Sequence, residues 1–274
     1  MQRPAAAPHP YVLYSAATQA VESDLSFARR VYRRLNGKEP RRLREDFCGT
    51  ARLACAWAGQ GEDHAAWGVD VDAGALHWGD RHYRQPMGSA AERVHLVRGD
   101  VRRARTPPAD LLLALNFSYF VFKDRRTLGG YLRHARAALA PGGILVLDIF
   151  GGTRAITATC EQKTIRGAHG PDGRPLKPFR YIWEHAHFDA VTHHVLCHIH
   201  FKLHDGTRLK KAFTYDWRLW TIPEIRELMR EAGFRSSRVY THGWTAEGNS
   251  NGVFREVKRF DNELGWLGYV VGER

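Results

Sequence analysis

The chain has 274 residues, of which 43% are hydrophobic, 26% charged and 11% aromatic, as is ordinary for a globular protein with a buried core. This length suits one large α/β domain with an insertion, or two small domains. No run of about eighteen apolar residues occurs, so we expect no transmembrane helix, and the Ala/Pro-rich start is not typical of a signal peptide. The 41 basic and 29 acidic residues give a net charge of +12, which is compatible with phosphate-rich partners.

The cysteines and the basic residues add two expectations. The four cysteines form no Cys-x-x-Cys pair, and a chain of this size does not need disulfides, so we expect free thiols and a cytoplasmic protein. The densest basic run lies between residues 29 and 44. It lacks the interleaved aromatics of an RNA-binding motif, which favours a solvated helix face over a nucleic-acid surface.

The first 150 residues alternate between helical and strand-like patterns. Residues 20–35 carry apolar side chains at three- and four-residue spacing, which predicts a helix capped by Ser23 or Asp24 and ended by Asn36-Gly37. The expected strands that follow are 43–47, 65–71, 94–97, 110–115 and 143–149, and the expected helices are 52–58, 73–83 and 126–139. Such alternation indicates right-handed βαβ units and a parallel sheet.

The pattern changes after residue 150. Residues 151–179 are rich in Gly, Pro, Lys and Arg and are expected to form a loop. Residues 180–215 alternate apolar and polar side chains, which predicts an inserted antiparallel sheet of three strands. A helix over 222–232 and strands over 236–241 and 265–271 follow. The fold predicted is α/β: a Rossmann-like, seven-stranded, mostly parallel sheet with helices on both faces, plus the inserted antiparallel sheet.

Acidic residues lie at or just after the ends of three predicted strands. Glu45 precedes a tight turn around Gly49 that opens a helix, and such a turn brings backbone N–H groups close to a ligand. Asp70 ends the second strand, where a carboxylate can accept hydrogen bonds from both hydroxyls of a ribose. Asp100 follows the third strand, where an Asp and a backbone N–H can bind the amino edge of adenine. Together these residues predict an adenosine site at the carboxyl edge of the sheet.

Over residues 40–150 this pattern resembles the class I S-adenosylmethionine-dependent methyltransferases. The resemblance implies an enzyme with S-adenosyl-L-methionine as cofactor and S-adenosyl-L-homocysteine as product. It assigns nine residues to the cofactor: Glu45, Phe47, Cys48, Gly49, Asp70, Val71, Asp100, Val101 and Asn116. Only Gly49 remains of the family's Gly-x-Gly-x-Gly loop, because Phe47 and Ala51 stand at the outer positions. Those two residues also argue against an NAD site, whose glycines must admit a pyrophosphate.

The end of the fourth strand, by the same resemblance, faces the transferred methyl group. Asn116 and Tyr119 are therefore candidates for positioning the acceptor. The alternative is that Tyr119 packs into the core together with Phe117 and Phe120. Both interpretations remain open at the level of sequence.

Candidate acceptor contacts also come from outside the core. Trp217, between Asp216 and Arg218, suits a pocket wall for a cationic or zwitterionic acceptor, with a packed sheet–helix junction as the alternative. Tyr14 lies in an N-terminal segment that is either a lid over the cofactor or a surface segment. We divide the chain into an N-terminal helical lid (1–40), the cofactor-binding core (41–150), the inserted sheet (151–215) and a C-terminal part of the core (216–274). The inserted sheet is expected to cover an acceptor or to form a dimer face.

Seven histidines between residues 185 and 204 raise the question of a metal. No Cys or carboxylate completes a tetrahedral set with them at telling spacing, so we expect no metal and a solvated sheet face. Three functions are compatible with these features. The first is methylation of a small molecule at nitrogen, oxygen or carbon, without a membrane partner and with a homodimer as an option. The second, suggested by the charge, is methylation of RNA or protein. The third, suggested by the altered glycine loop, is a non-catalytic S-adenosylmethionine-binding module.

Overall fold

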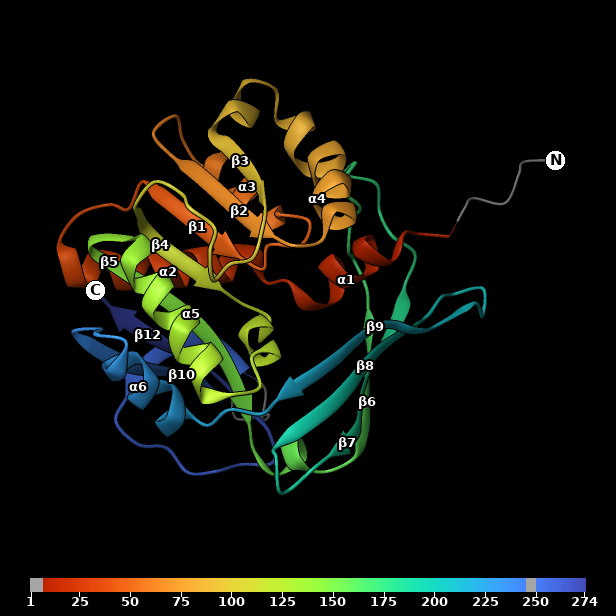
Figure 1. Ribbon diagram of the computed structural model, residues 1–274. Helices are drawn as coiled ribbons and strands as arrows, with labels where there is room; N and C mark the ends of the chain where they lie inside the picture. Colours follow the sequence, from red (N-terminus) through yellow and green to blue (C-terminus); the bar gives the residue numbers. More distant parts are fainter. Residues whose placement is uncertain (1–6, 245–249) are drawn as a thin grey trace.

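The computed structural model describes residues 7–244 and 250–274. Its larger sheet has eight strands in the order β11-β10-β12-β5-β4-β1-β2-β3 (Figure 1). Five neighbouring strands are parallel: β1 (Arg42–Asp46), β2 (Ala65–Asp70), β3 (Val94–Arg98), β4 (Ala109–Ala114) and β5 (Leu139–Gly151). The chain passes from β1 to β2 and β3 on one side and then returns to β4 on the other. The carboxyl ends of β1 and β4 therefore border the switch point at which ligands bind in such sheets.

Three further strands extend the sheet beyond β5. They are β12 (Trp266–Glu273), β10 (Ser236–Trp244) and β11 (Ser250–Val257), and each is antiparallel to the strand before it in the sheet. The expected α/β fold is confirmed. The sheet has one strand more than the seven expected, because β11 adds to the edge at β10.

Helices cover both faces of this sheet because its strands are apolar on both sides. Leu112, Leu145 and Val270 share a core with α5 (Arg125–Ala138) and α6 (Ile222–Glu231). Their neighbours Leu111, Ile144 and Val271 share a second core with α2 (Val21–Asn36) and α3 (Arg52–Ala58). Successive strand residues point to opposite faces, so this alternation buries the sheet between two helical layers.

Two helix details differ from the expectation. The helix expected over 73–83 is α-helical only in α4 (Ala73–Gly79) and continues as a π-helical turn over Asp80–Arg84. α2 starts after Ala20 without a side-chain cap, and Gly37 ends it in the left-handed conformation as expected. Asp24 does not cap α2, because its carboxylate accepts a hydrogen bond from the Tyr269 hydroxyl instead.

The inserted sheet has four antiparallel strands rather than three. They are β6 (Thr159–Ile165), β7 (Phe179–Phe188), β8 (His194–Lys202) and β9 (Arg208–Arg218). β6 lies within the segment expected to be a loop. It is an edge strand with mostly exposed side chains, so it lacks the apolar alternation that marks a strand in the sequence.

An N-terminal helix, α1 (Pro10–Thr18), links the inserted sheet to the core. Leu13 and Ala17 pack with Ile199 and Phe201 of the inserted sheet. On its other side, Arg52 at the start of α3 donates a hydrogen bond of 3.0 Å to the carbonyl of Ser15. Figure 1 shows α1 between α4 and the inserted sheet. No helix in the described part of the chain is long and apolar enough to cross a membrane.

Candidate functional site: a strand-end loop and an inter-sheet cavity

The loop between β1 and α3, residues 47–51, has an alternating backbone conformation. Phe47, Gly49 and Ala51 have φ angles of 57°, 54° and 54°, all in the left-handed region. These are the three positions that the Gly-x-Gly-x-Gly pattern fills with glycine. A left-handed residue with a Cβ costs roughly 1–2 kcal/mol, so the surrounding structure must impose this shape. We call this segment the β1–α3 loop.

Two glycines outside the β1–α3 loop allow its close packing. A Cβ on Gly68 of β2 would lie 2.9 Å from the sulfur of Cys48, and one on Gly79 of α4 would lie 2.0 Å from the carbonyl oxygen of Thr50. The backbone N–H of Cys48 also donates to the carbonyl of Val69 over 3.1 Å. By contrast, a Cβ on Gly49 would meet no atom within 4 Å. β2 and α4 therefore pack closely against Cys48 and Thr50 of the loop, whereas the side of the loop at Gly49 faces open space.

Asp70 connects β2 to this loop. Its carboxylate accepts hydrogen bonds of 2.7 Å from the N–H of Gly49 and 2.8 Å from the N–H of Asp72. Asp70 is only partly buried, and Val71 after it is 66% exposed, which leaves this strand end accessible. Burial and the charges of Asp72 and Asp70 raise the pKa of Tyr11, which places α1 beside this strand end.

Glu45 lies beneath the loop rather than on its surface. Its carboxylate is buried and accepts a 2.9 Å hydrogen bond from the N–H of Ala54 in α3. Burial, assisted by nearby carboxylates that include Asp70, raises the pKa of Glu45 to about 8. The Cys48 thiol is also buried, and its pKa is raised well above the usual value for the same reason. Glu45, Cys48, Gly49 and Asp70 are thus brought together, as the sequence predicted.

Asp100 follows the end of β3 and forms an ion pair with Arg102. Its two carboxylate oxygens accept hydrogen bonds of 3.0, 3.0 and 2.5 Å from the Arg102 guanidinium, which lowers its pKa. Val101 is buried, and its carbonyl points inward to Arg44 over 3.1 Å. The N–H of Gly99 donates to the carbonyl of Asp70 over 2.8 Å, so this end of β3 adjoins the end of β2.

The end of β4 is organised by an acidic residue that the sequence analysis did not single out. Asp148 of β5 accepts hydrogen bonds of 2.7 and 2.8 Å from the backbone N–H groups of Asn116 and Phe117. Both of these residues are left-handed, with φ angles of 56° and 57°. Burial raises the pKa of Asp148 to about 8. The signal was available, because Asp148 is the one acidic residue in the apolar run of β5.

Tyr119 belongs to the core. Its side chain is fully buried and its hydroxyl donates to the carbonyl of Asp148 over 3.0 Å. Phe120 is equally buried, whereas Asn116 and Phe117 line a cavity. Tyr119 can therefore support the end of β5 but does not reach an acceptor in this cavity, and Asn116 remains the exposed member of the predicted pair.

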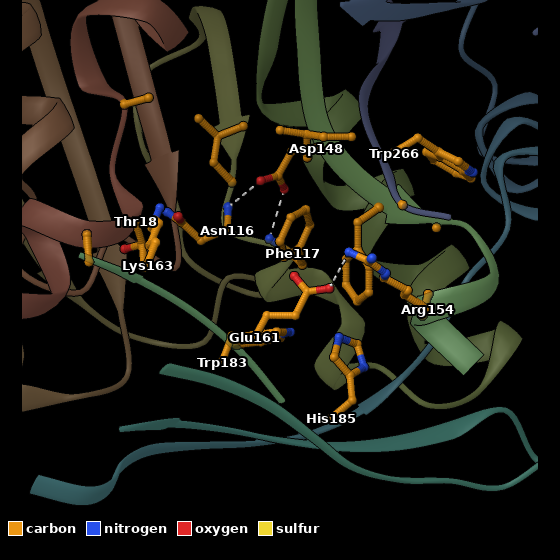
Figure 2. A pocket seen from close by; sticks show the side chains of 18 of the residues that line it. Thr18, Asn116, Phe117, Asp148, Arg154, Glu161, Lys163, Trp183, His185 and Trp266 are labelled. Carbon is orange, nitrogen blue, oxygen red and sulfur yellow. Dashed lines mark hydrogen bonds and ion pairs between the residues drawn. The ribbon is translucent and has the colours of Figure 1, made fainter. Parts of the chain in front are cut away.

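A cavity of about 1440 Å³ lies between the carboxyl edge of the main sheet and the inserted sheet. We call it the inter-sheet cavity. Figure 2 shows that it is lined by Asn116, Phe117 and Asp148 of the core and by Glu161, Trp183 and His185 of the inserted sheet. Tyr14 of α1 and Tyr269 of β12 also line it. It therefore opens directly beside the end of β4, whereas Glu45, Asp70 and Asp100 are not among its lining residues.

The predicted acceptor contacts on β9 alternate between residues that line the cavity and residues that face away from it. Tyr215 and Trp217 line the inter-sheet cavity, but Asp216 and Arg218 do not. Asp216 is paired with Lys123 at 2.5 Å with 65% of its side chain exposed, and Arg218 is paired with Glu224 at 2.9 Å. Alternate residues of β9 point to opposite faces, so one of the two faces serves the cavity and the other serves the junction with α6. Tyr14 and Trp217 are the members of that predicted set that the structure places there.

Several charged and titratable groups in the cavity were not predicted. Arg154 and Glu161 form an ion pair of 2.9 Å, and the ammonium of Lys163 lies 5.2 Å from the Tyr181 ring. Burial lowers the pKa of both Lys163 and His185. A sequence signal could not have found Glu161 or Lys163, since they belong to β6, the strand that was expected to be a loop.

The histidines of the inserted sheet are not equivalent. The register of β7 against β8 shifts between His185 and His187, so a bulge separates them. His185 is buried at the cavity and His187 is exposed, so the expectation of a solvated sheet face is wrong for His185. His198 pairs with Thr214 and His200 with Glu184. Among residues 7–244 and 250–274, no group of three or more His, Cys, Asp or Glu could hold a metal ion.

No family model and no curated protein sequence matches the chain. Solved structures do match, and they show that it has the fold of the S-adenosylmethionine-dependent methyltransferases. One is the amino pentose methyltransferase CalS10 of Micromonospora echinaspora, involved in calicheamicin biosynthesis and solved with its cofactor, which aligns over 100% of both chains with 14% identity and a TM-score of 0.68. Another is DesVI of Streptomyces venezuelae, with 15% identity over 97% of this chain and 98% of that one and a TM-score of 0.69. The sugar N-methyltransferase KedS8 of a Streptoalloteichus species aligns over 100% of this chain and 96% of that one, with 17% identity and a TM-score of 0.62.

Proposed function

We propose that the chain is an S-adenosylmethionine-dependent methyltransferase that acts on an amine of a small molecule. The observation that carries this proposal is the position of the inter-sheet cavity. It begins at Asn116 and Phe117, at the switch point of the sheet, next to a left-handed loop that is open above Gly49. A nucleoside cofactor held along the strand ends would direct its reactive end into that cavity.

The residues at the strand ends fit this cofactor. Open space over a left-handed Gly49 lets a ligand approach the backbone, which a side chain would prevent. The partly exposed Asp70 offers a carboxylate to a ribose, and Asp100 with the Val101 backbone lies at the next strand end for the adenine. Glu45, Phe47 and Cys48 shape the loop, Val71 would contact the ribose, and Asn116 would lie next to the methyl group. When bound, the cofactor supplies a methyl group activated by a sulfonium.

The inter-sheet cavity supports an amine as the acceptor. Aromatic side chains that include Trp183, Tyr215 and Trp217 line it, and aromatic faces attract the positive charge that an amine gains on methylation. CalS10 acts on an amino pentose and KedS8 on a sugar nitrogen, by their descriptions. The amine attacks as its free base, the N–CH₃ bond forms as the S–CH₃ bond breaks, and the product nitrogen then releases one proton.

His185 is suited to accept that proton. It lines the cavity, and burial lowers its pKa, which favours the neutral ring that can accept a proton. α1 and the inserted sheet (β6 to β9) are proposed to enclose the acceptor, with Tyr14 and Trp217 in the walls of its cavity. Keeping water out of such a site favours an in-line displacement between two held groups.

The surface charge favours a small acceptor over RNA. Part of the basic run that begins in α2 is already paired: Arg29 and Arg33 bind Glu39 at 2.7 and 2.9 Å, and Arg34 binds Glu256. These pairs leave less free positive charge on that helix for a phosphate backbone than the composition suggests.

The test of cofactor binding compares two glycines that share one conformation. Gly49 and Gly37 have φ angles of 54° and 67°, and a Cβ would meet no atom within 4 Å at either position. Gly49→Ala and Gly37→Ala therefore introduce similar backbone strain, of roughly 1 kcal/mol. We expect only Gly49→Ala to weaken S-adenosylhomocysteine binding, by at least about tenfold in calorimetry. Lack of binding by the folded wild-type chain would refute the proposal. Turnover is then measured with amino sugars and other small amines by release of S-adenosylhomocysteine.

A further inference from the structure

A buried ion pair occupies β1 beside the proposed cofactor site. The Nε of Arg44 lies 2.7 Å from an oxygen of Asp46, and both side chains are 0% exposed. The two residues are separated by one position on the strand and therefore share a face of the sheet. Burying two charges in a core gives little or no net stability compared with apolar residues of the same volume. Stability alone therefore does not explain the pair.

Nearly all other hydrogen bonds of the pair go to one segment, residues 101–106. The Arg44 guanidinium donates to the carbonyls of Val101 and Ala104, each over 3.1 Å, and to the Thr106 hydroxyl over 3.4 Å. Asp46 also accepts a hydrogen bond of 3.1 Å from the hydroxyl of Tyr131 in α5. The pair thus ties the segment after β3 to β1 and, through Tyr131, to α5.

This anchoring determines how a particular peptide group points. The Arg44 bond turns the carbonyl of Val101 into the core. In a trans peptide the N–H points opposite to the C=O, so the N–H of Arg102 points outward. There it donates a 2.9 Å hydrogen bond to the carboxylate of Asp100. The orientation of the Asp100 carboxylate is thereby linked to the buried guanidinium.

We propose that Arg44 and Asp46 are positioning residues that hold the segment after β3 so that Asp100 and the Val101 backbone select adenine as the base of the cofactor. The inference rests on the proposed function, because it concerns the same site. An apolar pair would fill the same volume but would leave the carbonyl of Val101 without its donor, whereas the carbonyl of Ala104 would keep its 2.8 Å contact with the ring of His134. The segment would then be free to rotate the peptide groups next to Asp100.

The test is a comparison of two ligands that differ only at the base. S-adenosylhomocysteine presents the 6-amino group of adenine, and S-inosylhomocysteine presents an oxygen there. The double variant Arg44→Met/Asp46→Leu removes both charges. We expect its preference for the adenine ligand, as a ratio of calorimetric dissociation constants, to fall at least tenfold relative to wild type. We also expect faster hydrogen exchange at the amides of residues 101–106 in the ligand-free protein.

A control variant separates positioning from general destabilisation. Asp110 is another buried carboxylate of the same sheet, which accepts hydrogen bonds from the N–H groups of Arg41 and Arg42 over 2.8 and 2.9 Å. Asp110→Asn is expected to lower stability while leaving the base preference within twofold. Should the double variant not fold, Tyr131→Phe removes one bond to Asp46, and a roughly threefold loss of preference is expected.

The outcomes are distinguishable. A folded double variant with unchanged base preference, together with normal wild-type binding, would overturn the positioning role alone. Absence of S-adenosylhomocysteine binding to the wild-type chain would overturn the proposed function and this inference with it. Slow exchange at residues 101–106 in the double variant would also contradict the inference, whatever the ligand data show.

Discussion

In the β1–α3 loop the backbone sets the geometry, whereas in the inter-sheet cavity side chains from two sheets set it. The loop keeps three left-handed residues although only Gly49 is a glycine. The cavity depends on which face of β9 carries Trp217 and on a bulge in β7 that separates His185 from His187. The shape of the loop therefore persists without two of its three glycines, whereas the lining of the cavity depends on the register of its strands.

The largest effect expected is at Asp70. Asp70→Ala removes the acceptor for the N–H of Gly49 and the carboxylate offered to the ribose. We expect S-adenosylhomocysteine affinity to fall at least about a hundredfold in calorimetry. The control is Asp124→Ala, which removes a carboxylate bonded to the N–H of Thr127 at the start of α5. Equal losses in the two variants would contradict the assignment of Asp70.

The next effect is expected at the cavity. His185→Asn removes the neutral imidazole proposed to accept a proton, so kcat should fall about tenfold while KM changes less than threefold. His187→Asn is the matched control, since His187 is exposed on the same strand beyond the bulge. Steady-state kinetics with an amine that the wild-type protein methylates give kcat and KM for both variants. A similar decrease in both variants would remove the role assigned to His185.

The buried acids predict a pH dependence of stability for the ligand-free protein. Burial raises the pKa of Glu45 from 4.5 to about 8, so between these values the folded chain holds a proton that the unfolded chain has lost. The free energy of unfolding should therefore decrease as pH rises from about 4.5 to 8. Glu45→Gln should flatten this slope in urea titrations, and Asp124→Asn should not. Burial of Asp148 acts in the same direction.

The smallest effect concerns the strained loop itself. Ala51→Gly places at a left-handed position the residue that adopts it without steric cost, so we expect an increase in stability of up to about 1 kcal/mol. Thermal unfolding should show a rise in Tm of a few degrees at most. Ala54→Gly, in the helical backbone of α3, should lower the Tm. A lower Tm in both would show that the Ala51 methyl group matters more than its φ angle.

The sequence predicted the core better than the insertion for a physical reason. Asp70 was found because it ends the mostly apolar run of β2, and Glu45 was found because it precedes the tight turn around Gly49. The ends of parallel strands lie at one edge of the sheet by topology. β6 was missed because an exposed edge strand has no such run. The bulge next to His185 and the positions of Asp216 and Arg218 depend on register, which one residue can invert. Asp148 was missed although it is the one acidic residue in the apolar run of β5.

The conformation of Phe47 and Ala51 has a consequence for recognising related chains. If neighbours such as Gly68 and Gly79 impose the turn, then the turn itself is free to lose its own glycines. The requirement for small residues then lies in β2 and α4, which pack against the loop, and not in the loop itself. A signature that requires glycine at 47 and 51 would overlook this molecule, whereas one that requires small residues at 68 and 79 would retain it.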